Sequence, residues 1–495
     1  MTQNLYFMQS TLKPEAFTSN AEVEQCLNEL RLQFGNQFEK LIISDTFDEH
    51  NHQYVNLVQK GGGVLGVALV GYTYILEKVG IRFLRLAGTS AGAINTSLLA
   101  VIGNKEDAKS EKILEYLCKL DFFSLVDGNR AAQWLIKMVI KKKKFEQQIT
   151  EYLKFLLISF VALFVADLAF LGLEHWFGWA GTAAAVLFFV SCFLLLLLFV
   201  LFIWISSLLR KFKESGYGIN PGKVFYEWIK ARMEENGVHT VSDLNGKVES
   251  LPKLSVRKPD KQNASTLKGD VTFISSELIS ENKIEFPRMC PLFSEHIDDL
   301  HPAGFVRASM SIPFFFESFI IENIRPTPKI KAAWENIFDP GTDPPPQARF
   351  VDGGILSDFP INIFYNPAII EPRLPSFGID LDDSDPNQEK QSDATNWSLL
   401  SYVGRIFNTI RFYYDKDFLL KNKVFQKGIG KIPLAEFNWL NFFLTDEEKL
   451  KMFVKGARAA CDFLKGFDWA AYQQERIQMQ TILNEKQAPE KPGNG

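Results

Sequence analysis

One serine in the sequence stands between two glycines at a strand-to-helix junction. The motif G-T-S-A-G, centred on Ser90, follows the apolar run 81–87, typical of a buried strand, and opens the run 91–102, typical of a buried helix. A sharp turn would expose the Ser90 hydroxyl at the helix start, and Gly88 and Gly92 would let the two backbone segments cross closely. The helix N-terminus also favours an anion beside the serine. The motif indicates a nucleophilic serine, although a tight turn with a helix-capping serine fits the same residues.

A second glycine cluster lies upstream, inside the range 54–80, between a short strand pattern and an apolar helix pattern. It contains Gly61, Gly62, Gly63 and Gly66. Consecutive glycines destabilise regular structure, so their presence needs another reason. An oxyanion hole supplies one, because its backbone amides must approach a reacting oxygen without side chains in the way. A nucleotide-phosphate loop is the competing interpretation, but the Lys-Ser/Thr pair of a P-loop does not follow the cluster.

The base that a serine nucleophile needs is expected to be an aspartate. Asp352 ends an apolar run that is typical of a strand, and Gly353 and Gly354 complete a turn there. A carboxylate on such a turn can accept the serine proton directly when packing brings the two side chains together. By itself, Asp-Gly-Gly is equally typical of a plain turn. The histidines stand in no arrangement that favours a catalytic base or a metal site, and each is expected to be structural. They are His50, His52, His175, His239, His296 and His301.

Taken together, these motifs resemble the patatin-like phospholipase family. The sequence carries GGGVLG, GTSAG and DGG in the family's order, and RASMSIPFFFESF, residues 307–319, resembles the segment that precedes the family's DGG. The resemblance implies a three-layer α/β/α hydrolase fold, which the alternation of strand and helix patterns also favours. By the same resemblance, Ser90 is the nucleophile, Asp352 is the base of a dyad, and amides around Gly62 and Gly63 form the oxyanion hole.

The resemblance runs from about Tyr54 to Asp380 and has one departure. Leu65 stands where the family usually carries arginine or lysine. Backbone amides need no side chain, so hydrolysis is still expected, but a positive charge that could orient the loop or attract a phosphate is missing. The departure leaves open whether the enzyme prefers a charged head group.

The composition is compatible with a large enzyme. The chain has 495 residues, of which 46% are hydrophobic and 23% charged, enough for one large core or two smaller ones. The formal net charge is −4 and no basic domain is present, so nucleic acid is not an expected partner. The five cysteines are scattered, which is typical of reduced thiols rather than of a disulfide framework. Neither a metal nor an organic cofactor is expected for serine-based acyl transfer.

Two long apolar runs interrupt the catalytic region and predict a transmembrane helical hairpin. Residues 155–173 carry one charge, Asp167, and residues 180–209 carry none, so each run can cross a bilayer as a helix. Trp176 and Trp179 in the turn suit a membrane interface. Basic residues at both outer ends put the catalytic parts on the cytoplasmic side. The alternative is an apolar cap buried over the active site. The basic residues are Lys141, Lys142, Lys143, Lys144, Lys154, Arg210, Lys211 and Lys213.

The expected function is a membrane-bound hydrolase that cleaves fatty acyl esters of phospholipids or lysophospholipids, with the lipid and the bilayer as its partners. Two alternatives stay open: a catalytically silent membrane scaffold or lipid-binding protein of the same fold, and a soluble lipase with an apolar lid. No secretory signal is expected in the first twenty residues, which lack a continuous apolar core. The expected segments are an N-terminal extension (1–52), two catalytic parts (53–150 and 211–385) around the hairpin (151–210), a C-terminal helical region (386–470) and a polar tail (471–495).

Overall fold

The chain forms two compact units. The catalytic unit takes the residues up to 126, then 222–313, and then those from 318 onwards, whereas the inserted unit takes 127–221 and 314–317. The insertion therefore divides the catalytic unit along the sequence. The computed structural model describes residues 12–128, 154–155, 158–166, 168–169, 173, 176–214, 216–257, 267–338, 341–383 and 399–487.

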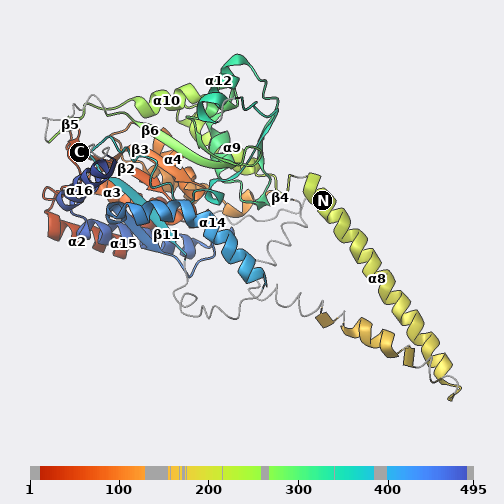
Figure 1. Cartoon of the computed structure of the whole chain (residues 1–495). Coiled ribbons are helices and arrows are strands. Elements are labelled where there is room, and N and C mark those ends of the chain that lie inside the picture. Colours follow the sequence, from red (N-terminus) through yellow and green to blue (C-terminus); the bar gives the residue numbers. More distant parts are fainter. Residues whose placement is uncertain are drawn as a thin grey trace, which may run out of the picture. The chain divides into compact units, whose positions relative to one another are not determined.

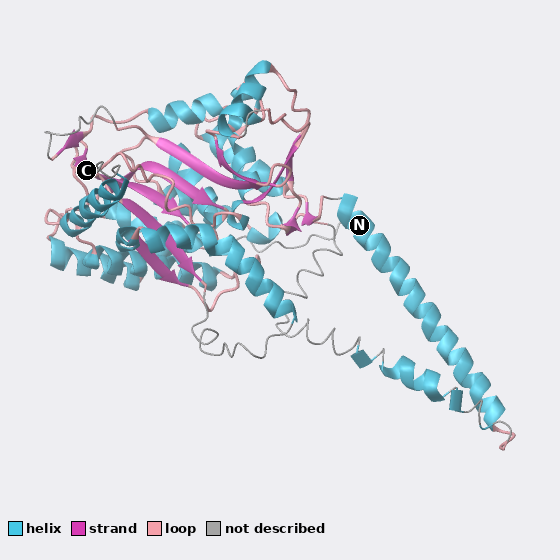
Figure 2. Ribbon diagram, in the orientation of Figure 1, coloured by secondary structure: helices cyan, strands magenta, loops and turns pink. Residues whose placement is uncertain are grey.

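A mostly parallel sheet lies at the centre of the catalytic unit (Figures 1 and 2). The strands from β12 to β6 run parallel to one another, while β10 and β7 pair antiparallel with β6. The central strand β2 is buried along its whole length, as expected for a parallel strand covered on both faces. The order is β12 (Ile429–Pro433), β11 (Ser376–Asp382), β2 (Gln53–Gln59), β3 (Ile81–Thr89), β6 (Asp270–Glu277), β10 (Ala348–Asp352) and β9 (Phe319–Ile321). Strand β7 (Asn282–Phe286) also pairs with β6, the short β1 (Thr46–Phe47) pairs with β2, and β5 (Ser255–Val256) pairs with β1.

Helices cover both faces of this sheet. Successive side chains of β2 point to opposite faces. Gln59 accordingly bonds Thr96 of α4 (Ala91–Val101) at 2.9 Å, whereas Val58 packs with Trp469 and Tyr472 of α16 (Trp469–Gln487). The mixed α/β fold predicted from the sequence is confirmed at this level. The other helices of the unit are α1 (Pro14–Thr18), α2 (Ala21–Phe34), α3 (Gly66–Lys78), α5 (Ser110–Lys119), α9 (Lys223–Glu235), α10 (Val241–Glu249), α11 (Pro302–Ser309), α12 (Pro328–Ile337), α14 (Leu399–Lys421) and α15 (Asp446–Gly466).

The inserted unit holds one long apolar helix, α8 (Ala180–Glu214). Within α8, the stretch Gly181–Trp204 is long enough to cross a bilayer, and its most apolar window has a mean hydropathy of 3.3 and is only 6% buried. The same unit contains the parallel strand pair β4 (Gly218–Asn220) and β8 (Phe314–Phe316).

The structure therefore describes only part of the predicted transmembrane hairpin. Of its first helix, 155–173, the structure describes pieces, of which 158–166 is helical, and α8 is the one helix among the described residues that is long and apolar enough to span a membrane. Several residues of the prediction lie outside the described residues, so a two-helix crossing remains a prediction. They are Asp167, the Glu174-His175 pair of the turn and the Lys141–Lys144 run.

Candidate active site

The turn that holds Ser90 joins a strand directly to a helix, and the serine is buried, with 3% of its surface exposed, rather than exposed as predicted. Strand β3 ends at Thr89 and α4 begins at Ala91, so Ser90 is the single residue between them, with φ 52° and ψ −119°. A non-glycine residue in this left-handed region costs on the order of 1–3 kcal/mol, and such strain persists only where surrounding contacts impose it. Here, the Ser90 amide donates to the Ser309 hydroxyl at 2.9 Å, and the Thr89 hydroxyl donates to the Ser357 carbonyl at 3.0 Å.

The two glycines that flank the serine are required by close backbone crossing. A Cβ at Gly88 would lie 2.4 Å from the carbonyl of Gly92, and a Cβ at Gly92 would lie 2.2 Å from the carbonyl oxygen of Gln59 in β2. Both distances are far below any van der Waals contact, so neither position accepts a side chain without backbone movement.

The register of β6 explains how Asp352 comes to lie beside Ser90. Residues 273–277 of β6 pair with β7 along one edge, so β3 and β10 must share the other edge. Thr89 at the end of β3 pairs with Ile274, and Asp352 at the end of β10 pairs with Ser275. Because β3 and β10 run in opposite directions, their carboxyl ends meet at consecutive residues of β6. The Ser90 side chain lies close enough to the Asp352 carboxyl to lower its pKa through a hydrogen-bonding interaction.

Asp352 is a buried carboxylate with few compensating donors. Its side chain accepts the Gly354 amide at 2.7 Å, its own amide donates to the Ser311 carbonyl at 2.8 Å, and the residue is 6% exposed. Burial raises the pKa of Asp352 to about 7, against the opposing effects of the hydrogen bonds from Ser90 and from the Gly354 amide. A carboxylate with a pKa near neutrality is well matched to accept a proton and return it.

The glycine loop passes directly against the nucleophile. A Cβ at Gly61 would lie 3.2 Å from the Cβ of Ser90. The Gly61 amide donates to the Asp358 carbonyl at 3.0 Å and the Gly66 amide donates to the Gly63 carbonyl, so both of these amides are occupied. The amides of Gly62 and Gly63 donate to no acceptor in the part of the chain that the structure describes. Of the four glycines predicted for an oxyanion hole, these two have amides available for a ligand oxygen.

Leu65 lies inside the core, with 1% of its surface exposed. Two cations do lie near the loop and the base turn, but each has a carboxylate partner. Lys60 pairs with Asp380 at 2.7 Å, and Arg411 lies 3.4 Å from the carboxylate of Asp358. Neither cation replaces the loop arginine or lysine as an unpaired charge.

The sequence analysis missed three charged residues of the site. They are Asp358, which follows the base turn, and Arg411 and Asp415 of α14. Arg411 donates through Nε to the Gly354 carbonyl at 2.5 Å and faces Asp358. Asp415 accepts the Ser357 hydroxyl at 2.7 Å and the Phe359 amide at 2.8 Å, and burial raises its pKa to about 6. The available signal was the i, i+4 spacing of Arg411 and Asp415, which puts both on one side of a helix.

Two of the described histidines, His52 and His301, make local hydrogen bonds through their rings. His52 bonds Asp48 at 2.9 Å, and His301 accepts the Ala303 amide at the start of α11, while His175 lies outside the described residues. Among the described residues, no group of three or more histidine, cysteine, aspartate or glutamate side chains is arranged to hold a metal ion.

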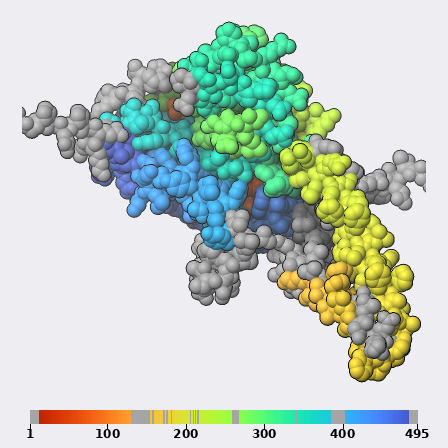
Figure 3. All heavy atoms as spheres, turned by 45° about the vertical axis from the view of Figure 1, so that its right-hand side comes forward, coloured from red at the N-terminus to blue at the C-terminus, as the bar shows by residue number. Residues whose placement is uncertain are grey.

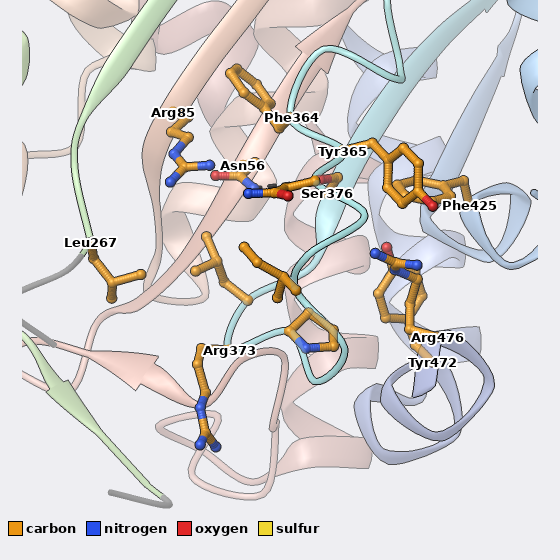
Figure 4. A pocket seen from close by; sticks show the side chains of 14 residues that line it. Asn56, Arg85, Leu267, Phe364, Tyr365, Arg373, Ser376, Phe425, Tyr472 and Arg476 are labelled. Carbon is orange, nitrogen blue, oxygen red and sulfur yellow. Dashed lines mark hydrogen bonds between the residues drawn. The ribbon is translucent and has the colours of Figure 1, made fainter. Parts of the chain in front are cut away.

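A separate cavity of about 60 Å³ lies away from the serine and the aspartate, with Asn56 of β2 and Ser376 at the start of β11 in its wall (Figure 4). None of the serine, aspartate or glycine-loop residues lines it. In Figure 4 the guanidinium groups of Arg85, Arg373 and Arg476 lie apart rather than converging on one point, so the cavity does not form an anion site.

The fold and this constellation define a hydrolase of the α/β/α class with a serine on a strand-to-helix turn. The family profile of patatin-like phospholipases matches residues 57–365, which is more than half of the chain. The chain therefore belongs to the patatin-like phospholipase family. The uncharacterized protein YqhO of Bacillus subtilis (strain 168) is 24% identical over 412 residues, which cover 83% of this chain and 98% of that protein. Among solved structures, VipD from Legionella pneumophila aligns with 86% of this chain and 70% of its own at 15% identity, with a TM-score of 0.32.

Proposed function

We propose that the protein is a membrane-bound serine acyl hydrolase that cleaves fatty acyl esters of phospholipids or lysophospholipids with a Ser90–Asp352 dyad. One observation carries the proposal: the register of β6 brings the ends of the strands that precede Ser90 and carry the buried Asp352 to consecutive positions, beside a loop with two unoccupied amides. A hydroxyl, a base and two converging donors are the minimum set for acyl transfer.

In the first step, the Ser90 oxygen attacks the ester carbonyl carbon and its proton passes to Asp352. The carbonyl oxygen becomes an oxyanion, held by the amides of Gly62 and Gly63 in a buried site where such hydrogen bonds are strongest. Collapse of this intermediate breaks the ester bond, and the departing alcohol takes the proton from Asp352. Water then attacks the acyl-serine, again giving a proton to Asp352, and the fatty acid leaves as the proton returns to Ser90.

The apolar stretch of α8 supports the membrane part of the proposal. Its most apolar window is 6% buried, so its side chains have no protein surface to cover them within the described chain. A soluble helix of this composition would expose far more apolar area than soluble proteins tolerate. Basic residues follow at its end, namely Arg210, Lys211 and Lys213, as expected at a cytoplasmic membrane boundary.

Labelling with a serine-reactive fluorophosphonate tests the catalytic proposal. The purified wild-type protein should be labelled at Ser90 and should release fatty acid from phospholipid vesicles. The Ser90→Ala variant should lose both properties, and Asp352→Asn should lose turnover, while both stay folded and in the membrane fraction. Turnover that survives in either variant would contradict the dyad.

Leu65, in place of the family's usual arginine or lysine, favours a second candidate, a catalytically silent membrane scaffold or lipid-binding protein of this fold. That protein would bind vesicles without being labelled and without releasing fatty acid. Extraction with carbonate at high pH tests the membrane proposal on its own, since an integral protein stays with the membrane and a soluble lipase with an apolar lid is released.

A further inference from the structure

Helix α14 has two chemically different sides. With about 3.6 residues per turn, Arg411, Asp415 and Phe418 fall on one side of the helix. Tyr402, Ile406, Ile410, Tyr413 and Leu420 fall on the opposite side, and we call these five residues the apolar stripe. Helix α14 lies at the surface of the catalytic unit and is drawn in blue (Figures 1 and 3).

The inner side of α14 holds the segment that carries the base. Arg411 bonds the Gly354 carbonyl two residues after Asp352, and Asp415 bonds the Ser357 hydroxyl and the Phe359 amide. This segment in turn contacts both other parts of the site, because the Ser357 carbonyl accepts the Thr89 hydroxyl and the Asp358 carbonyl accepts the Gly61 amide. A displacement of α14 would therefore disturb the hydrogen bonds that position the base, the nucleophile turn and the glycine loop.

The outer side of α14 exposes large side chains that a soluble surface would not gather. Ile410 is 69% exposed, Leu420 is 67% exposed and Tyr413 is 65% exposed, and Ile406 and Tyr402 continue the stripe by one turn each. Isolated exposed apolar residues are common, but five on one face of one helix, which Asp417 shares as its acidic residue, form a patch that marks an interaction surface.

The chemistry of this surface fits a bilayer interface better than another protein. Tyrosines within the stripe are typical of the head-group level, and four basic against two acidic residues make the helix cationic. The basic residues are Arg405, Arg411, Lys416 and Lys421, and the acidic residues are Asp415 and Asp417.

Chain connectivity also keeps the catalytic unit near a bilayer. The chain passes from Glu214, the last residue of α8, to Gly222 of the catalytic unit, a connection that spans at most about 28 Å when fully extended. If α8 crosses the membrane, the catalytic unit cannot move far from its surface, so an apolar helix face on that unit meets lipid at a high effective concentration.

We infer that the apolar stripe of α14 docks into the surface of the bilayer that α8 spans, and that this contact holds Arg411 and Asp415 in the positions that support the active site. The inference rests on the proposed function. It adds a second membrane contact, distinct from α8, and makes the site most active when the enzyme faces lipid.

Fluorescence quenching tests the docking. Cys192 lies in α8 and is the exposed one among the five cysteines, so Cys192→Ser gives a background whose remaining thiols are buried. A polarity-sensitive dye is attached at Ile410→Cys in this background and compared with Ile482→Cys on α16, a residue 52% exposed, in nanodiscs with brominated or ordinary acyl chains. The dye at 410 should be quenched at least about twofold by brominated lipid, and the dye at 482 should not. Equal quenching at both positions, or none at 410, would overturn the docking.

Kinetics test the coupling to the site. The double variant Ile406→Glu/Ile410→Glu should lose about tenfold or more of its turnover on phospholipid vesicles, because two carboxylates replace apolar groups at the interface. Its turnover of a short-chain soluble ester in nanodiscs should fall as well, because the lost lipid contact no longer holds Arg411 and Asp415 in place, and the matched Ile482→Glu variant should match wild type on both substrates. Equal turnover of vesicles by the double variant and wild type would overturn the inference.

These outcomes separate the inference from the proposed function. A protein that is labelled by fluorophosphonate at Ser90 but shows no quenching at position 410 keeps the hydrolase proposal and loses the docking of α14. Concentration-dependent cross-linking through position 410, without quenching by brominated lipid, would assign the stripe to a second copy of the chain and would likewise overturn the docking.

Discussion

Replacing Asp352 by asparagine is expected to abolish turnover and at the same time to stabilise the protein at neutral and alkaline pH. The carboxylate is buried, and its burial raises the pKa of Asp352 from an ordinary value near 4 to about 7. Burying an ionised carboxylate costs folding free energy unless donors compensate for its lost hydration. Asparagine has nearly the same shape and keeps an oxygen that can accept the Gly354 amide, but it carries no charge.

The size and the sign of the stability change follow from the shift in the pKa of Asp352. A pKa difference of about three units between the folded and unfolded states corresponds to about 4 kcal/mol. Below about pH 4 the group is protonated in both states and contributes nothing. As the pH rises, the unfolded state ionises first, so stability falls by up to about 1.4 kcal/mol per pH unit until about pH 7, and the loss is constant above that. The advantage of Asp352→Asn over wild type should therefore grow by about 2.5 kcal/mol between pH 5 and pH 8.

Urea unfolding of the detergent-solubilised protein, followed by tryptophan fluorescence at pH 5, 6.5 and 8, measures this difference. Ser90→Ala is the matched control, because it is expected to be equally inactive but retains the buried Asp352 and hence the loss of stability with rising pH. The reasoning fails if the free energy of unfolding of Asp352→Asn has the same pH dependence as that of wild type and of Ser90→Ala. It fails equally if the asparagine variant hydrolyses lipid at a rate near that of wild type.

Three further results are expected. The kcat/KM of wild type should rise with pH and level off above about 7, because Asp352 must be ionised to accept a proton, and a pH–rate profile on a soluble ester measures this. Arg411→Met should shift the midpoint of this pH–rate profile upward by up to about one unit, because the positive charge of Arg411 lowers the pKa of Asp352 in the wild type. Arg411→Lys keeps the charge and should retain most of the wild-type profile. Gly92→Ala should lower the free energy of unfolding by more than about 3 kcal/mol, because its Cβ would lie 2.2 Å from the Gln59 carbonyl oxygen. Gly246→Ala in α10, where nothing lies within 4 Å of the added Cβ, should instead add up to about 1 kcal/mol, and chemical unfolding of the two variants compares them.

The local motifs were predictable because their geometry is imposed by neighbouring residues. Gly88 and Gly92 flank a turn in which a Cβ at either position would collide with backbone, so the five-residue motif G-T-S-A-G predicts the serine turn. The glycine loop was less clear, since residues 61–66 also fit the G-x-G-x-x-G spacing of dinucleotide loops, and the sequence alone does not exclude that interpretation. What favours an oxyanion hole is a long-range contact, the approach of Gly61 to Ser90.

The rest of the site depends on contacts that sequence patterns do not encode. The meeting of Thr89 and Asp352 is set by the register of β6, in which consecutive residues pair with strands from distant parts of the chain. The supports from Arg411 and Asp415 come from a helix beyond the family match at 57–365, and its apolar residues suggest a core helix until their exposure is known. Periodicity identifies a helix and its faces, but not the partner of each face.

The charges around the site bear on the meaning of Leu65. The buried base Asp352 has a second carboxylate, Asp358, as its neighbour, and that neighbour raises the pKa of Asp352 further. The nearby cations Lys60 and Arg411 are each paired with a carboxylate, so neither of these two described residues offers an unpaired positive charge to a phosphate. An anionic head group held next to the base would also oppose the ionisation on which the proposed proton transfer depends. We therefore expect the acyl chain and the bilayer contact to select the substrate, with the head group held outside the loop. Similar kcat/KM values on neutral and on phosphate-bearing esters of the same acyl chain would support this expectation. A strong preference for the phosphate-bearing ester would refute it.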